Sequence, residues 1–174
     1  MKKHVLLMTV LSLLILAVTA SAQTATDYAG TWTLNVAQSR ISDREKAATE
    51  FQSLTVVQSD KDVVVTTTTR RAAPPGAKTV AGSMTSTFTF DGKETIVSMN
   101  GRDGKPLPVR TRGMWDGSKL ILTTSRTHGS PQGELTIVQK DTWDLTPDGK
   151  TLIIRREQTG PEGTMTTARL YTKS

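Results

Sequence analysis

The chain has 174 residues and no cysteine, so disulfide bonds and cysteine-held metal or redox centres are excluded. Its 22 basic and 16 acidic residues give a net charge of +6, and they are scattered rather than concentrated in a basic, aromatic-rich patch. Nucleic-acid binding usually relies on such a patch, so we expect no nucleic-acid partner. The length suits one domain with its own packed core.

The N-terminus has the features of an export signal. Lys2 and Lys3 precede an almost wholly apolar run over residues 5–18, and Ala20-Ser21-Ala22 fits the small-residue cleavage rule. The alternative, an uncleaved anchor, is disfavoured because the run is shorter than the ~20 residues of a spanning helix. We therefore predict a signal peptide over 1–22 and a periplasmic or secreted domain over 23–174. Loss of the two lysines lowers the net charge from +6 to +4.

Threonine and valine dominate the remaining chain, and long helical periodicity is missing, which predicts an all-β fold. Only residues 42–51 favour a short helix, with Ser42 and Glu45 spaced as a capping box. The ten predicted strands cover residues 28–35, 51–59, 62–70, 84–90, 93–99, 108–115, 118–126, 134–146, 150–158 and 164–172.

The predicted connections alternate between short and long. The short ones are centred on 60–61, 91–92, 116–117 and 147–149, and most carry the Asp-Gly pair of tight hairpin turns. The long ones cover 36–50, 71–83, 100–107, 127–133 and 159–163. This alternation predicts an up-and-down antiparallel meander that curls into a barrel, with tight turns at its closed end and loops around its open end.

Strand side chains alternate between the two faces of a sheet, so period-two patterns predict the barrel interior. The inward sets are Tyr28, Gly30, Trp32 and Leu34; Leu120, Leu122, Thr124 and Arg126; Leu135, Ile137, Gln139, Asp141, Trp143 and Leu145; and Leu152, Ile154 and Arg156.

The Gly30-Thr31-Trp32 motif on the first strand resembles the lipocalin and calycin group. The resemblance implies that Trp32 plugs the closed end and that Arg169, on the last strand, packs across it. Independently, Gly30 leaves room for a large neighbour against the strand. The chain departs from the group in lacking its other motifs and its C-terminal helix, and in having ten strands rather than eight.

The wider segments "GTWTLNVAQSR" (30–40), "FDGKE" (90–94) and "WDLTPDGKTLII" (143–154) look like a set of exported bacterial lipocalin-like proteins of unassigned function. This likeness covers most of the chain after the leader. It implies a fold and not an activity.

No pattern for catalysis or metal binding is found in the sequence. His128 is the sole histidine outside the leader, so a zinc site is not expected. Ser125 and Ser130 flank His128 but lack the third group that orients a catalytic base. We expect no cofactor, no metal and no enzymatic activity.

Two functions remain open: a barrel that binds a small apolar or amphipathic ligand, and a filled barrel that contacts a partner through its loops. For the first, we predict an elongated, anionic ligand whose charged end meets Arg126 and Arg156 near the mouth, above Leu122, Thr124 and Ile154. The alternative is that the arginines pair with protein acids such as Asp141 or Glu157, or that a one-residue slip turns them outward. A monomer is expected in either case.

Overall fold

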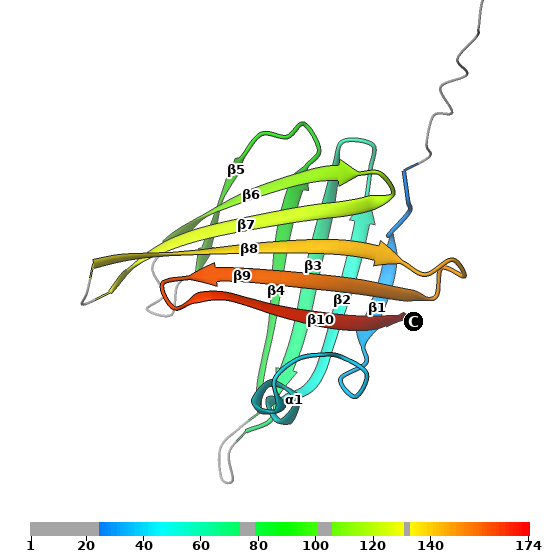
Figure 1. The fold of residues 1–174 in the computed structure, drawn as a ribbon, viewed down its shortest axis with the longest axis horizontal. Coiled ribbons are helices and arrows are strands. Elements are labelled where there is room, and N and C mark those ends of the chain that lie inside the picture. The colour runs from blue at the N-terminus through cyan, green and yellow to red at the C-terminus, as the bar shows by residue number, and fades with distance from the viewer. Residues whose placement is uncertain (1–24, 74–78, 101–105, 131–132) are drawn as a thin grey trace, which may run out of the picture.

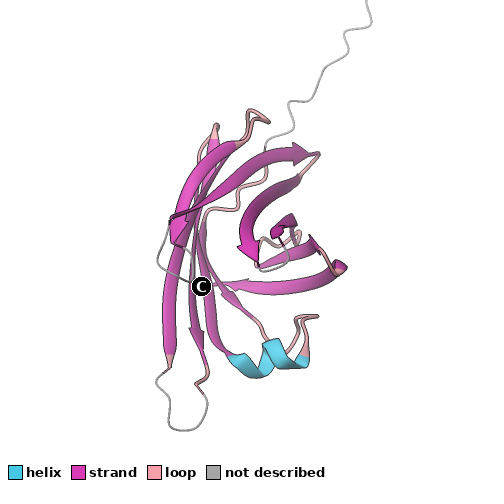
Figure 2. Cartoon of the chain, turned by 90° about the vertical axis from the view of Figure 1, so that its left-hand side faces the viewer, coloured by secondary structure: helices cyan, strands magenta, loops and turns pink. Residues whose placement is uncertain are grey.

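The structure is a computed structural model, and it describes residues 25–73, 79–100, 106–130 and 133–174. Ten strands form a single antiparallel sheet in the order β4-β3-β2-β1-β10-β9-β8-β7-β6-β5 (Figure 1). Each strand lies beside its neighbour in sequence, except that β1 pairs with β10 and β4 does not pair with β5. The pairing of the first and last strands curls the meander around an interior (Figure 2).

The observed elements confirm the predicted all-β meander. One short helix, α1, connects the first two strands. The elements are β1 (Gly30–Leu34), α1 (Asp43–Ala48), β2 (Thr49–Gln58), β3 (Asp62–Arg71), β4 (Val80–Thr89), β5 (Thr95–Asn100), β6 (Pro106–Asp116), β7 (Lys119–Ser130), β8 (Gly133–Leu145), β9 (Thr151–Gly160) and β10 (Gly163–Lys173).

Two of the predicted long loops, 127–133 and 159–163, are wrong. β7 continues to Ser130 and β9 to Gly160, and only two residues separate each strand from the next. The antiparallel pairing continues to Ser130 opposite Gly133 and to Gly160 opposite Gly163, and residues 131–132 lie outside the described residues. Hydroxyl pairs strengthen it: Thr127 with Thr136 at 2.9 Å and Thr159 with Thr164 at 2.8 Å. Cross-strand side-chain pairs of this kind stabilise a sheet, and local turn signals in the sequence do not report their contribution.

The barrel has one seam, between β4 and β5, where no ladder joins the described residues. Thr111 of β6, which is fully buried, bridges this seam: its hydroxyl donates to the carbonyl of Thr87 on β4 at 2.8 Å. Nearby, a Cβ at Gly113 would lie only 3.0 Å from the carbonyl oxygen of Thr89. The lack of a side chain there lets the two edges approach closely, so the barrel is nearly closed.

The closed half of the interior is filled by the protein's own side chains. The indole nitrogen of Trp32 donates to the carbonyl of Tyr28 at 2.9 Å, and the Tyr28 hydroxyl donates to the carbonyl of Trp143 at 3.0 Å. The rings of Tyr28 and Trp143 meet edge to face, 5.7 Å apart. The buried cluster comprises Tyr28, Trp32, Leu34, Leu54, Val56, Val63, Val65, Phe88, Leu120, Leu122, Trp143, Leu152, Ile154 and Tyr171. The inward sets predicted from alternation account for much of it.

The Gly-x-Trp motif has its explanation at this end of the barrel. Trp32 lies opposite Lys173 of β10, whose ammonium sits 5.2 Å from the centre of the indole ring. The Lys173 side chain passes over Gly30, where a Cβ would lie 3.1 Å from Cε, and the φ of +129° at Gly30 also favours glycine. Gly30 therefore makes room for the cation that covers Trp32.

The structure does not bring Arg169 to Trp32. Arg169 precedes Lys173 by four residues on β10, which is about 13 Å along a strand. Its guanidinium binds Glu45 of α1 instead. Lys173, not Arg169, occupies the position over the tryptophan because the register of β1 and β10 places it there.

Candidate functional site

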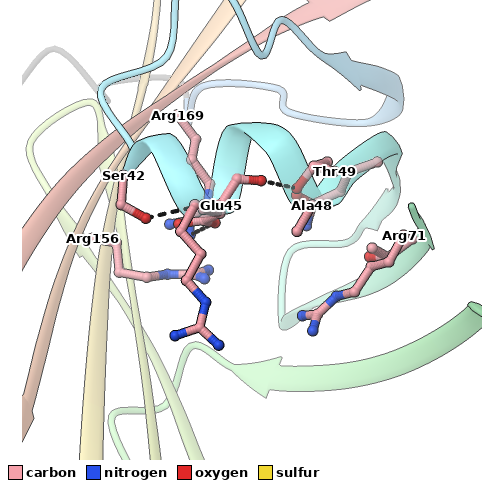
Figure 3. Close-up of a pocket in the computed structure, with 10 residues that line it drawn as sticks. Ser42, Glu45, Ala48, Thr49, Arg71, Arg156 and Arg169 are labelled. Carbon is pink, nitrogen blue, oxygen red and sulfur yellow. Dashed lines mark hydrogen bonds and ion pairs between the residues drawn. The ribbon is translucent and has the colours of Figure 1, made fainter. Parts of the chain in front are cut away.

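A cavity of about 310 Å³ lies at the open end of the barrel, beneath α1. Glu45, Arg156 and Arg169 gather under the helix, and Arg71 reaches toward them from the end of β3 (Figure 3). The cavity is lined by Ser42, Arg44, Glu45, Ala48, Thr49, Gln52, Thr69, Arg71, Arg156 and Arg169. Four of these lining residues are arginines, so guanidinium groups dominate the cavity wall.

The short helix α1 positions Glu45 over this cavity. Ser42 caps the helix, and its hydroxyl accepts from the backbone N–H of Glu45 at 3.1 Å. Of the two hydrogen bonds of the predicted capping box, the one accepted by Ser42 is present. The Glu45 carboxylate turns to the barrel interior instead and accepts a hydrogen bond from Arg169.

Arg169 is held at the inner face of β10 and is 7% exposed. Besides Glu45, it donates to the hydroxyl of Thr167 at 3.0 Å. A buried guanidinium needs such partners, because an unpaired buried charge is costly. Glu45 therefore satisfies Arg169 across 124 residues of sequence.

Arg156 of β9 is paired with Asp141 of β8, directly opposite in the sheet. Its Nε and one terminal nitrogen each donate to a different oxygen of Asp141 at 2.7 Å, a two-point geometry. Gln139 donates to the same carboxylate at 3.1 Å. Burial by itself lowers the pKa of Arg156, but the hydrogen bonds and charge of Asp141 outweigh it and raise that pKa above its usual value. The predicted alternative, an Arg156–Asp141 pair, is therefore confirmed.

Arg44 and Arg71 differ from these two arginines. Within the described parts of the chain, neither forms an ion pair. The neighbouring Arg70 points the other way, where it pairs with Glu50 at 3.3 Å. Counted with Asp141, the four arginines and two carboxylates of the mouth leave a net charge of +2.

A second cavity, of about 330 Å³, adjoins the first along β3 and β4. The two share Thr69 and Arg71. The second is bordered on β4 by Val80, 67% exposed, and Met84, 47% exposed. The arginine cavity therefore continues into a groove that exposes apolar side chains.

The predicted ligand-binding residues are distributed differently from the expectation. Of these, only Arg156 lines the arginine cavity; Leu122 and Ile154 belong to the packed core. Arg126 occupies an inner-face position opposite Ile137 but is exposed and lines neither cavity. By the register of the strands, Arg126 lies four residues farther along the barrel wall than Arg156, about 13 Å in the strand direction. The structure therefore does not bring these two arginines together.

Sequence reasoning missed Arg44, Glu45 and Arg71 and gave Arg169 a different place. For Arg71 a signal existed, since it continues the inward alternation of Val65, Thr67 and Thr69 on β3. For Glu45 no local signal distinguishes a capping side chain from one that points to the barrel.

Across the described residues, no group of histidine, aspartate and glutamate side chains is arranged to hold a metal ion. The helical segments in the same part of the chain include none that is long and apolar enough to cross a membrane.

No protein-family model matches the sequence, and no curated protein matches it. Among solved structures, the chain is similar to the zebrafish ileal bile acid-binding protein complexed with cholic acid, with 18% identity and a TM-score of 0.46. That comparison covers 84% of this chain and 98% of the other. The topology itself, ten antiparallel strands in up-and-down order with β1 against β10, is that of a lipocalin-like barrel.

Proposed function

We propose that this barrel binds a small amphipathic anion at its mouth. The arginine cavity carries the proposal: four guanidinium groups line it, and Glu45 is the sole acid among its lining residues. Guanidinium groups match carboxylate, sulfate and phosphate geometry, and bind them most strongly where water is partly excluded. The anionic group is proposed to contact Arg71 and the edge of Arg169.

The adjoining groove suits the apolar part of such a ligand. Val80 and Met84 border it, and it meets the arginine cavity at Arg71. Each cavity lies near the lower limit of small-molecule sites, roughly 300–1,000 Å³. Since aromatic and aliphatic side chains fill the closed half of the barrel, the ligand lies across the mouth rather than along the axis.

Calorimetric titration with an eight-carbon series tests the head-group requirement. Octanoate and octyl sulfate are expected to bind, and octanol and octylamine to bind at least tenfold more weakly, because only the anions gain charge-assisted hydrogen bonds worth about 1.5–3 kcal/mol. Equal affinity for all four, or no binding of any, contradicts the proposal.

A pair of adjacent arginines supplies the matched variants for this test. Arg71→Gln is expected to weaken octanoate about tenfold, since it removes the guanidinium shared by both cavities. Arg70→Gln removes the same charge from the outer face, where Arg70 pairs with Glu50, and is expected to leave the affinity unchanged. An equal loss in both variants points to general electrostatics rather than to this site.

The second candidate is a filled barrel that acts on a partner through its surface, and the packed closed half favours it. The two are separated by the same titrations. A folded protein that binds none of the four amphiphiles supports the filled barrel.

We further propose that the protein works outside the cytoplasm, after cleavage between Ala22 and Gln23. The basic start, the short apolar run and the Ala-Ser-Ala site support it. N-terminal sequencing of the mature protein is expected to begin at Gln23. Mature protein that retains Lys2 or Lys3 contradicts this localisation.

A further inference from the structure

The two ion pairs at the barrel mouth are built differently. Asp141 holds Arg156 from the neighbouring strand with both of its oxygens, and the Asp141 side chain is only 10% exposed. Glu45 holds Arg169 from α1, a six-residue helix with no buried residue, and its side chain is 34% exposed. The carboxylate of Glu45 therefore has a route to solvent that Asp141 lacks.

The consequences of losing each carboxylate also differ. If Asp141 released Arg156, its own carboxylate, only 10% exposed, would stay largely buried without its charged partner, which is strongly unfavourable. If Glu45 left Arg169, an incoming anion would take its place, so the guanidinium would stay paired while Glu45 became hydrated. Exchange of one carboxylate for another on the same arginine changes the free energy little, whereas loss of the carboxylate without replacement is costly.

From this contrast we infer that Glu45 is a built-in competitor for the anion site: it occupies Arg169 in the empty barrel, and a bound anion displaces it and releases α1. The inference rests on the proposed function and deepens it, because it names how the site is regulated. The binding of an anion is then coupled to the mobility of the helix over the mouth.

Backbone hydrogen bonds anchor the chain on both sides of the helix. Before it, Arg40 exchanges two with Ala168 of β10, at 2.7 and 3.0 Å. The backbone N–H of Ala72 donates to the carbonyl of Ala48 at 3.0 Å, at the end of α1 where the chain enters β2. Between these two anchors, the Glu45–Arg169 pair ties the body of the helix to the barrel wall, so the turns of α1 loosen once Glu45 leaves Arg169.

The first arm of the test compares two neutralised acids on the same helix. Glu45→Gln removes the competitor and keeps the side-chain shape, so octanoate is expected to bind about tenfold more tightly. Asp43→Asn changes the net charge equally, but Asp43 is exposed and does not line the cavity, so the affinity is expected to stay unchanged. Equal affinity of wild type and Glu45→Gln overturns the inference.

The second arm keeps Glu45 intact and follows the helix directly. Because the chain has no cysteine, a nitroxide attached at Ala47→Cys, an exposed position on α1, reports on the helix alone. Octanoate is expected to increase the mobility of this label, although ligands usually rigidify a site. A label at Val57→Cys, 63% exposed on the outer wall, is expected to be unaffected.

The outcomes separate the two proposals. Octanoate binding without increased mobility at position 47 overturns the competitor role and leaves the proposed function standing. Failure of octanoate and octyl sulfate to bind either wild type or Glu45→Gln overturns the proposed function, and the competitor role with it. Without ligand, the label in Glu45→Gln is expected to be more mobile than in wild type, and equal mobility also overturns the inference.

Discussion

At the scale of single residues, the motif at the closed end depends on three residues that meet only after the strands pair. Gly30 has no Cβ, so Lys173 crosses it and places its ammonium over the indole of Trp32. The indole is fully buried and donates to the carbonyl of Tyr28. Trp32 is thus a structural residue of the core and not a ligand-stacking one.

Replacing Trp32 with alanine is expected to lower the free energy of unfolding by about 3–5 kcal/mol, because the cavity left by an aromatic side chain closes only in part. Thermal and urea denaturation measure this loss. Val57→Ala, on the exposed outer wall, is the control and is expected to change stability by less than about 0.5 kcal/mol. An unchanged thermal midpoint for Trp32→Ala contradicts the assigned core.

Because the phenol of Tyr171 is buried, the folded protein is expected to lose stability at high pH. Burial raises the pKa of its phenol from 10.0 to about 12, although the charges of Arg169 and Arg156 oppose the shift. The unfolded chain ionises first, so stability is full below pH 10 and falls between pH 10 and about 12, by about 2–3 kcal/mol for this group.

Phenolate absorbance of the native protein and urea unfolding at several alkaline pH values check this expectation. Tyr28, whose pKa burial also raises to about 12, contributes a second step of the same sign. Tyr171→Phe is the control and is expected to reduce the pH dependence. Ionisation of Tyr171 near pH 10 in the native protein argues against its burial.

At the scale of elements, the seam between β4 and β5 is the weak line of the barrel. No ladder joins the two strands among the described residues, and Thr111 links β6 to β4 across it. The same hydroxyl also lies 3.3 Å from the carbonyl oxygen of Thr95 on β5. Thr111 therefore ties the two edges of the sheet together, and the hydroxyls of Thr89 on β4 and Thr95 on β5 add a weaker contact at 3.4 Å.

Thr111→Val keeps the shape of the side chain but removes this link, so the free energy of unfolding is expected to fall by about 1–3 kcal/mol. Hydrogen exchange in β4 is expected to accelerate at the same time. The matched variant is Thr66→Val, which removes a hydroxyl that pairs with Thr85 on the outer face, with little expected effect. Equal losses in the two variants would show that the seam has no special role.

At the scale of the whole molecule, the barrel is divided along its axis. Its closed half is a single apolar cluster drawn from nearly every strand, and its mouth is rich in arginine. All ten strands belong to one sheet around one core, so no part of the barrel is expected to unfold independently of the rest.

Urea unfolding is accordingly expected to be a single transition, with coincident midpoints from tryptophan fluorescence and far-ultraviolet circular dichroism. Trp32 and Trp143 report on the core, and Trp115 packs at its edge. Octanoate is expected to raise both midpoints together, since a ligand that binds only the folded state stabilises the whole of it. Two separated transitions would indicate that the halves of the sheet unfold independently.

The strands, most of their turns and the inward faces can be predicted from the amino-acid sequence alone. These depend on local chemistry: β-branched residues in alternation, and Asp-Gly pairs that adopt tight turns. Gly92, Gly117 and Gly149 all have positive φ, as their turns require. The short helix with its Ser42 cap is equally local.

The full extent of the strands, the partners of the charged side chains and the position of the cavity depend on how distant segments pack together. β7 and β8 extend into a predicted loop because each strand supplies the other's hydrogen bonds, and no local sequence signal reports that gain. Glu45 and Arg169 are 124 residues apart, and Lys173 rather than Arg169 covers Trp32 because of the β1–β10 register. Pairings of this kind depend on strand register and chain closure, and their energies exist only when distant segments have come together.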